Sequence, residues 1–70
     1  MKRIKCYVSM VNRENPSTTK GVIVYAFTVR DAMNLCDDRF PEWCSKTGLV
    51  LSPDGPYYVS NTDRLETITA

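Results

Sequence analysis

The three cysteines, Cys6, Cys36 and Cys44, are the first candidates for metal binding or catalysis. They include no Cys-x-x-Cys pair, and the chain contains no histidine. A structural zinc ion takes four ligands, so these thiols would have to recruit a carboxylate. Cys6 and Cys36 fall on apolar faces, where a free cysteine behaves as a small hydrophobic side chain. We therefore predict no metal and no cofactor. Free thiols are favoured over a Cys6–Cys36 disulfide, because the expected compartment is reducing.

Catalytic side chains are scarce in this sequence. Without histidine, the usual general base at neutral pH is missing. Cys44 as a nucleophile would need a neighbouring base or cation, and only Lys46 is close in sequence. Asp37 and Asp38 are adjacent on the expected helix, so their side chains diverge by about 100° and do not form a dyad. The sequence therefore predicts that the protein is not an enzyme.

Aromatic and cationic side chains alternate along the first expected strand and recur in the second. Arg3, Lys5 and Tyr7 occupy every second position, and so do Tyr25 and Phe27. Because alternate side chains on a strand point to one side of a sheet, they would share a face. Such residues anchor protein interfaces, and aromatic faces with cations also bind single-stranded nucleic acid. We predict a partner-binding face here. For the patch itself, self-association is favoured, with two such faces packed together or edge strands paired; a protein partner is the second explanation and single-stranded nucleic acid the third. As the function of the protein, we predict interaction with a protein partner, with nucleic-acid binding as the alternative.

A small acidic group lies on the expected helix and just beyond it. Asp37 and Asp38 precede Glu42, with Arg39 between them. The functional interpretation is a docking site for a basic partner or a mimic of nucleic-acid phosphate. An ordinary solvated helix face is the commoner meaning of three acidic charges. We keep Asp37 and Asp38 as candidate partner-binding residues, and the polar stretch 13–20 is a further candidate surface.

Size and composition restrict the function further. The chain has 70 residues, of which 43% are hydrophobic and 24% charged, and its net charge is +1. One small domain is expected, and a deep catalytic cleft is hard to build at this length. A binder of duplex DNA would carry a clear basic excess, which is present in the first strand but not in the whole chain. No apolar run fits a signal peptide or a membrane span, so we expect a cytoplasmic protein without membrane association.

The elements that position these residues follow from periodicity and turn chemistry. Residues 3–12 alternate between apolar and polar side chains, as a half-buried strand does. Residues 13–21 are polar and contain Pro16 and Gly21, which predicts a loop. Residues 22–27, VIVYAF, are rich in β-branched and aromatic side chains and predict a second strand. The two strands supply the two halves of the aromatic face.

The helix is the element with the clearest start and stop. Thr28 is a good N-cap with Asp31 three residues later, and Pro41 ends the helix at Phe40. Between these limits, apolar side chains recur with the helical period at Val29, Ala32, Met33, Cys36 and Phe40. A helix of about three turns is marginal alone in water, so the sheet must hold this stripe.

Beyond the helix, residues 49–52 predict a short third strand. The sequence Ser-Pro-Asp-Gly-Pro at 52–56 is strong turn chemistry, and residues 57–60 predict a fourth strand that completes a hairpin. The tail, residues 61–70, either adds an edge strand or frays. The second half of the sheet therefore rests on shorter signals than the first.

Together these elements predict an α+β fold in the order β-β-α-β-β, with one helix packed on one face of a small, mainly antiparallel sheet. The domain would span residues 1–60, with 61–70 as its tail or edge strand. Because the helix covers one face, the opposite face with Tyr7, Ile23 and Tyr25 would form an exposed apolar patch. The predicted core is Ile4, Cys6, Val8, Met10, Val22, Val24, Ala26, Val29, Ala32, Met33, Cys36, Phe40, Trp43, Leu49 and Leu51.

The span VIVYAFTVRDAMNLCDDRFPEW, residues 22–43, resembles a recurrent pattern in very short phage- and prophage-encoded proteins. In that pattern a strand ending in a small residue runs into a capped helix with alanine near its start, and an aromatic–proline pair ends the helix. Some anti-CRISPR inhibitors and other host-takeover proteins resemble this size and layout. The resemblance rests on folding signals. It implies a compact, non-enzymatic protein of the host cytoplasm that acts by binding, with inhibition of a host complex as its specific form.

Overall fold

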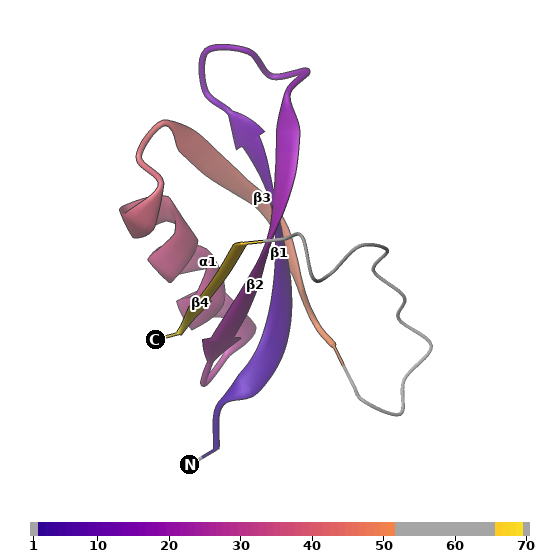
Figure 1. The fold of residues 1–70 in the computed structure, drawn as a ribbon, viewed down its shortest axis with the longest axis vertical. Coiled ribbons are helices and arrows are strands. Elements are labelled where there is room, and N and C mark those ends of the chain that lie inside the picture. The colour runs from indigo at the N-terminus through magenta and orange to yellow at the C-terminus, as the bar shows by residue number, and fades with distance from the viewer. Residues whose placement is uncertain (1, 52–65, 70) are drawn as a thin grey trace.

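The computed structural model describes residues 2–51 and 66–69, which form one helix and a four-stranded sheet. The chain order is β1 (Ile4–Asn12), β2 (Thr19–Ala26), α1 (Val29–Arg39), β3 (Trp43–Val50) and β4 (Glu66–Thr69). In the sheet the strands follow the order β3-β1-β2-β4, and α1 lies on one side of it (Figure 1). The predicted α+β class is confirmed, and the described elements follow the predicted pattern β-β-α-β-β, with residues 66–69 as the last strand.

The sheet is mixed, with antiparallel pairing at its centre. β1 pairs antiparallel with both β2 and β3, and β4 pairs parallel with β2. The predicted fourth strand, residues 57–60, lies outside the described residues. The edge strand that was one of the two alternatives for the tail is present at residues 66–69.

The third strand begins at Trp43, well before residue 49, where the sequence places its start. Its pairing with β1 extends from Trp43 to Val50, and the register shifts between Ser9 and Met10. A bulge of this kind interrupts the period-two alternation that marks a strand in a sequence. The polar run Cys-Ser-Lys-Thr-Gly is therefore held in the strand by its pairing with β1 and not by a local apolar pattern.

The loop after β1 is shorter than predicted, because β2 begins at Thr19. The side-chain oxygen of Asn12 accepts hydrogen bonds from the backbone N–H groups of Glu14 and Asn15, at 2.9 and 3.0 Å. Asparagine turns the chain early through such local bonds. As a result, Lys20 belongs to the sheet and not to the loop.

The helix follows its local signals closely. The Thr28 Oγ1 atom accepts a hydrogen bond from the backbone N–H of Asp31 at 3.0 Å, which confirms the N-cap. Phe40 forms the C-cap, and its N–H donates to the carbonyl oxygen of Cys36 at 2.9 Å before Pro41 stops the helix. The predicted helix limits are therefore confirmed.

The core lies between α1 and the sheet. Fully buried side chains line this interface: Cys6, Val8, Met10, Val22, Val24, Ala26, Ala32 and Cys36. Partly buried side chains close its rim: Ile4, Val29, Met33, Phe40 and Trp43. Because Val22 and Val24 face inward, the predicted choice of the covered face is confirmed. Leu49 was predicted in this core, but it lies opposite Tyr7 on the other face and is only half-buried.

Candidate binding surfaces

We call the sheet face opposite α1 the open face. It carries Lys5, Tyr7, Ile23, Tyr25 and Leu49. Lys5 lies opposite Tyr25 in the sheet register, and Tyr7 lies between Ile23 on β2 and Leu49 on β3. These positions alternate with core side chains, so they point away from the helix. Lys5 is exposed, whereas both tyrosines and Leu49 are half-buried. The structure thus brings three of the predicted site residues together: Lys5, Tyr7 and Tyr25.

The open face is less apolar than the sequence predicts, because Ile23 is only 2% exposed. Ile23 pairs with Tyr7 on one side and with Thr67 of β4 on the other. The Tyr7 ring lies across Gly21, where an added Cβ would stand 2.5 Å from the ring's Cε2 and Oη atoms. Because glycine has no Cβ, the Tyr7 ring can pack directly against the sheet backbone at Gly21. The predicted exposed apolar patch is wrong at Ile23, and a smaller aromatic surface takes its place.

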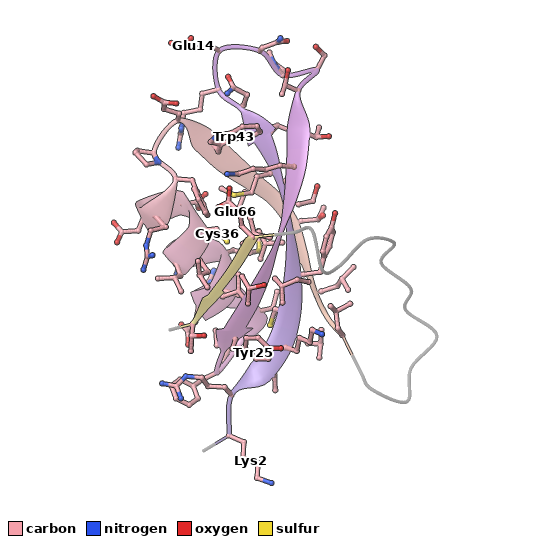
Figure 2. The ribbon with its side chains drawn as sticks, in the orientation of Figure 1. Lys2, Glu14, Tyr25, Cys36, Trp43 and Glu66 are labelled. Carbon is pink, nitrogen blue, oxygen red and sulfur yellow. The ribbon has the colours of Figure 1, made fainter. Side chains whose placement is uncertain are left out.

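Arg3 and Phe27 form a pair at the end of the sheet where the chain begins. The guanidinium carbon of Arg3 lies 5.2 Å from the centroid of the Phe27 ring, which is a cation–π distance. Phe27 follows β2 and is 38% exposed. Lys2 and Tyr25 lie at this same end of the molecule (Figure 2). With exposed Lys5 they make a local basic and aromatic region on a chain whose net charge is only +1.

Asp37 does not lie on a solvated helix face, where the sequence places it. Its Oδ1 atom accepts a hydrogen bond from the Ser45 backbone N–H at 2.8 Å, and its Oδ2 atom accepts one from the Ser45 hydroxyl at 3.0 Å. Asp37 is half-buried, whereas Asp38 and Glu42 are exposed. The prediction that Asp37 faces solvent is therefore wrong, because its carboxylate ties α1 to β3.

Removal of this tie should destabilise the fold. Asp37→Ala deletes two hydrogen bonds to a charged acceptor, so we expect the free energy of unfolding to fall by about 2 kcal/mol. Asp38→Ala removes the exposed carboxylate at the next position and should change it by about 0.5 kcal/mol or less. Urea denaturation followed by the emission of Trp43, the single tryptophan, measures both variants. Equal effects would contradict a structural role for Asp37.

All three thiols are free, and they differ in burial: Cys6 and Cys36 are buried, and Cys44 is half-buried. Burial raises the pKa of Cys6. Burial also raises the pKa of Cys36 to about 11, an effect that the Asp37 carboxylate increases and the Lys20 ammonium opposes. A raised pKa disfavours the thiolate, which is the reactive and metal-binding form. Within residues 2–51 and 66–69, no group of three or more His, Cys, Asp or Glu side chains is placed to hold a metal ion.

Thiol accessibility gives a direct test of this arrangement. In the native protein, we expect Cys44 alone to react rapidly with the aromatic disulfide reagent DTNB, and all three thiols to react after unfolding. Cys6 and Cys36 should react at least about 100-fold more slowly, because reagent reaches them only when the fold opens. Cys44→Ser should abolish the fast phase. Two or more fast thiols in the native wild-type protein would show that the core is open.

Lys20 is the centre of a cluster drawn from four elements. Its Nζ atom lies 3.6 Å from the centroid of the Phe40 ring and 4.7 Å from that of the Trp43 ring. The same Nζ atom stands 3.7 Å from the Oε1 atom of Glu66 on β4. Aromatic faces attract cations at these distances. The cluster therefore surrounds one ammonium group with two rings and a carboxylate.

Sequence reasoning missed this cluster because Lys20 sits among polar residues that predict a loop. The alternation of residues 20, 22 and 24 is the signal that would have found this cluster. It extends the second strand toward the N-terminus and places all three side chains on the helix side of the sheet. The contribution of Glu66 has no such signal, because it depends on how a distant strand pairs with β2.

The loop between β1 and β2 is tied to the connection between α1 and β3. The Arg13 backbone N–H donates to the Glu42 carbonyl oxygen at 3.0 Å, and its Nε donates to the Pro41 carbonyl oxygen at 3.1 Å. A hollow of about 280 Å³ lies between the two segments, lined by Asn12, Arg13, Glu14, Pro41 and Glu42. Because Arg13 holds backbone groups of its own chain, this region is a weaker candidate for binding than the open face.

Comparison of the chain with protein-family models, with curated proteins and with solved structures gives no match. Among the described residues, α1 falls short of the length and apolar character that a membrane-crossing helix needs. The surfaces that bear on function are the open face, the Arg3–Phe27 pair and the Lys20 cluster.

Proposed function

We propose that this chain is a small, non-enzymatic binding protein that acts by protein–protein interaction through the open face. The observation that carries this proposal is the placement of Lys5, Tyr7 and Tyr25 on neighbouring strands, on the side that α1 leaves uncovered. Exposed Phe27 extends the aromatic surface beyond the end of β2. Tyrosine suits such a surface, because it offers a large apolar ring together with a hydrogen-bonding hydroxyl.

Charge indicates the kind of protein partner. Three exposed cations lie at the start of the chain: Lys2, Arg3 and Lys5. Exposed acidic residues lie elsewhere, such as Asp38 near the end of α1 and Glu42 between α1 and β3. A partner with acidic side chains around an apolar centre would complement the basic end. Complementary charge raises the rate of association and discriminates against wrong partners.

A narrower form of the proposal is inhibition of a host complex by a phage-type protein. Its support is the resemblance of residues 22–43 to short phage- and prophage-encoded proteins, together with the small size of the chain. Those residues contribute most of β2, all of α1 and the first residue of β3. An inhibitor of this kind would act by covering a surface that the host complex needs, which requires a binding face and no catalytic group.

Single-stranded nucleic acid is the second candidate partner. The observation that favours it is the position of Lys5 opposite Tyr25, because a base can stack on the ring while its phosphate meets the ammonium group. The net charge of +1 works against it, since phosphate contacts dominate nucleic-acid affinity.

Site-specific photo-crosslinking tests the protein-binding proposal. A crosslinking amino acid replaces Tyr25 in one variant and Asn34 in the matched control, because Asn34 is exposed on α1, across the sheet from the open face. In cells that contain the protein naturally, we expect a discrete, nuclease-resistant protein adduct from position 25 and none from position 34. With that partner purified, Tyr25→Ala should weaken binding at least about tenfold, as truncation of an interface anchor does.

Two outcomes would overturn the proposal. An adduct that nuclease removes, with affinity that falls steeply as salt rises, would assign the open face to nucleic acid. A crosslink between two copies of this chain alone, with a dimer by light scattering that Tyr25→Ala dissociates, would show that self-association seals the face.

A further inference from the structure

The Lys20 cluster has the composition of a cation-binding site. Phe40 comes from the end of α1, Trp43 from the start of β3 and Glu66 from β4, and we call these three residues the cation cage. Trp43 and Glu66 lie on the helix side of the sheet (Figure 2). The Lys20 side chain inside the cage is 22% exposed, and that of Glu66 is 59% exposed. The cage therefore opens to solvent beside β4.

We propose that the cation cage is a binding site for an alkylammonium group, best matched by a methylated lysine side chain of a partner, and that Lys20 occupies it in the free protein. Ring faces attract cations, and aromatic residues around an ammonium group are the means by which proteins recognise quaternary ammonium ligands. Methyl groups reduce the hydration of the ammonium. A methylated cation therefore enters a half-buried cage with less loss of solvation than the strongly hydrated Lys20 ammonium.

Lys20 can leave the cage while the protein stays folded. Its four-carbon stem is flexible, and its 3.7 Å ion pair with half-exposed Glu66 is of a kind that contributes little. The cation–π contacts favour the occupied state by a factor of about 2 to 30. An incoming cation that must displace Lys20 loses about that factor in apparent affinity. A ligand that makes the same cation–π contacts can therefore displace Lys20 with a loss of apparent affinity of about this factor.

The competing explanation is that Lys20 is a fixed structural residue, in which case the cage has no room for another cation. The two explanations predict different cation binding by the cage once Lys20 is replaced by a shorter side chain. The cage is also on the opposite side of the sheet from Tyr25, so this inference is independent of the function proposed for the open face.

Fluorescence titration tests the inference, because Trp43 is both a wall of the cage and the single tryptophan of the chain. At constant ionic strength, tetramethylammonium chloride should give a saturable change in the Lys20→Ala variant, with wild-type affinity about tenfold weaker. Trimethyllysine amide should give the same saturable change and the same difference between the two proteins, whereas its uncharged tert-butyl isostere should not bind. In the Lys20→Ala background, Phe40→Leu should weaken binding at least about fivefold, because it removes one ring.

Lys46→Ala is the matched control, since Lys46 is an exposed lysine of β3, on a different strand from Lys20; it should keep wild-type affinity. Lys20→Met preserves most of the stem and replaces Lys20→Ala if that variant is unfolded by circular dichroism. A folded variant without a saturable response, or with an equal response to the uncharged isostere, would overturn the proposal. So would a wild-type protein that shows no response at ten times the concentration that saturates the variant.

Discussion

Gly48→Val is expected to lower the free energy of unfolding by about 3 kcal/mol, because α1 rests directly on this glycine. Gly48 lies opposite Val8 on the covered face of the sheet. A Cβ added at Gly48 would stand 2.8 Å from the Cγ1 atom of Val29, and 3.0 and 3.1 Å from the Cγ and Sδ atoms of Met33. Met33 is flexible, but the χ1 rotamer of a helical valine is stiff, so Val29 has to move with its helix.

The size of the effect matters because the domain is small. A chain of 70 residues is typically stable by about 4–10 kcal/mol, so this single change removes a large share. Gly48→Ala adds one carbon and gains some strand propensity, so its loss should be smaller, at about 1 kcal/mol. A graded series from glycine through alanine to valine is the signature of a helix in contact with the strand.

Thr47→Val is the matched control for this series. Thr47 is the preceding residue of β3, and it is exposed. The same β-branched side chain at that position should change the free energy of unfolding by about 0.5 kcal/mol or less. Urea denaturation followed by far-ultraviolet circular dichroism gives all three values. If Gly48→Val matched the control, α1 would not be seated where the structure places it.

The first strand and the helix could be predicted because their signals are local. The cap at Thr28, the stop at Pro41 and the alternation along β1 each act within a few residues, and the structure retains all of them. The helix also had one stripe to bury, so the choice between the two sheet faces followed once Val22 and Val24 were assigned to the same side.

The parts that sequence reasoning missed depend on residues far apart in the chain. β3 extends to Trp43 because it pairs with β1 across a bulge, and no pattern within the segment itself marks that extension. Asp37 turns toward Ser45 only because β3 runs beside α1. Lys20 acquires its partners from α1, β3 and β4 together. Each of these contacts exists only after the sheet has formed.

The open face shows the same dependence in a milder form. Its side chains were assigned to the correct side, because alternation decides direction. Its exposure was overestimated, because the burial of Ile23 depends on neighbours in other strands, and Tyr7 settles onto the sheet at Gly21. Periodicity therefore predicts which residues share a face, and cross-strand packing decides how much of that face a partner can reach.

Alkaline pH should destabilise the protein through Cys36, by about 3 kcal/mol once the pH exceeds 11. The folded-state pKa of this thiol is about 11, raised from the ordinary value of 9.0 by burial, with Asp37 increasing it and Lys20 opposing. Below pH 9 both folded and unfolded states hold the proton, and the full stability is present. Between pH 9 and 11 the unfolded chain loses the proton while the folded protein keeps it, so stability falls as pH rises.

Cys36→Ala isolates this effect, because every other side chain is common to both proteins. The variant should be less stable than wild type at pH 8, since it leaves a small cavity, but its stability should fall less steeply between pH 9 and 11. Cys44→Ala retains Cys36 and should follow the wild-type curve. Urea denaturation in steps of pH, under reducing conditions, gives the three curves. Parallel curves for wild type and Cys36→Ala would mean that the Cys36 thiol ionises as easily in the folded protein as in the unfolded chain, which a fully buried side chain between α1 and the sheet does not allow.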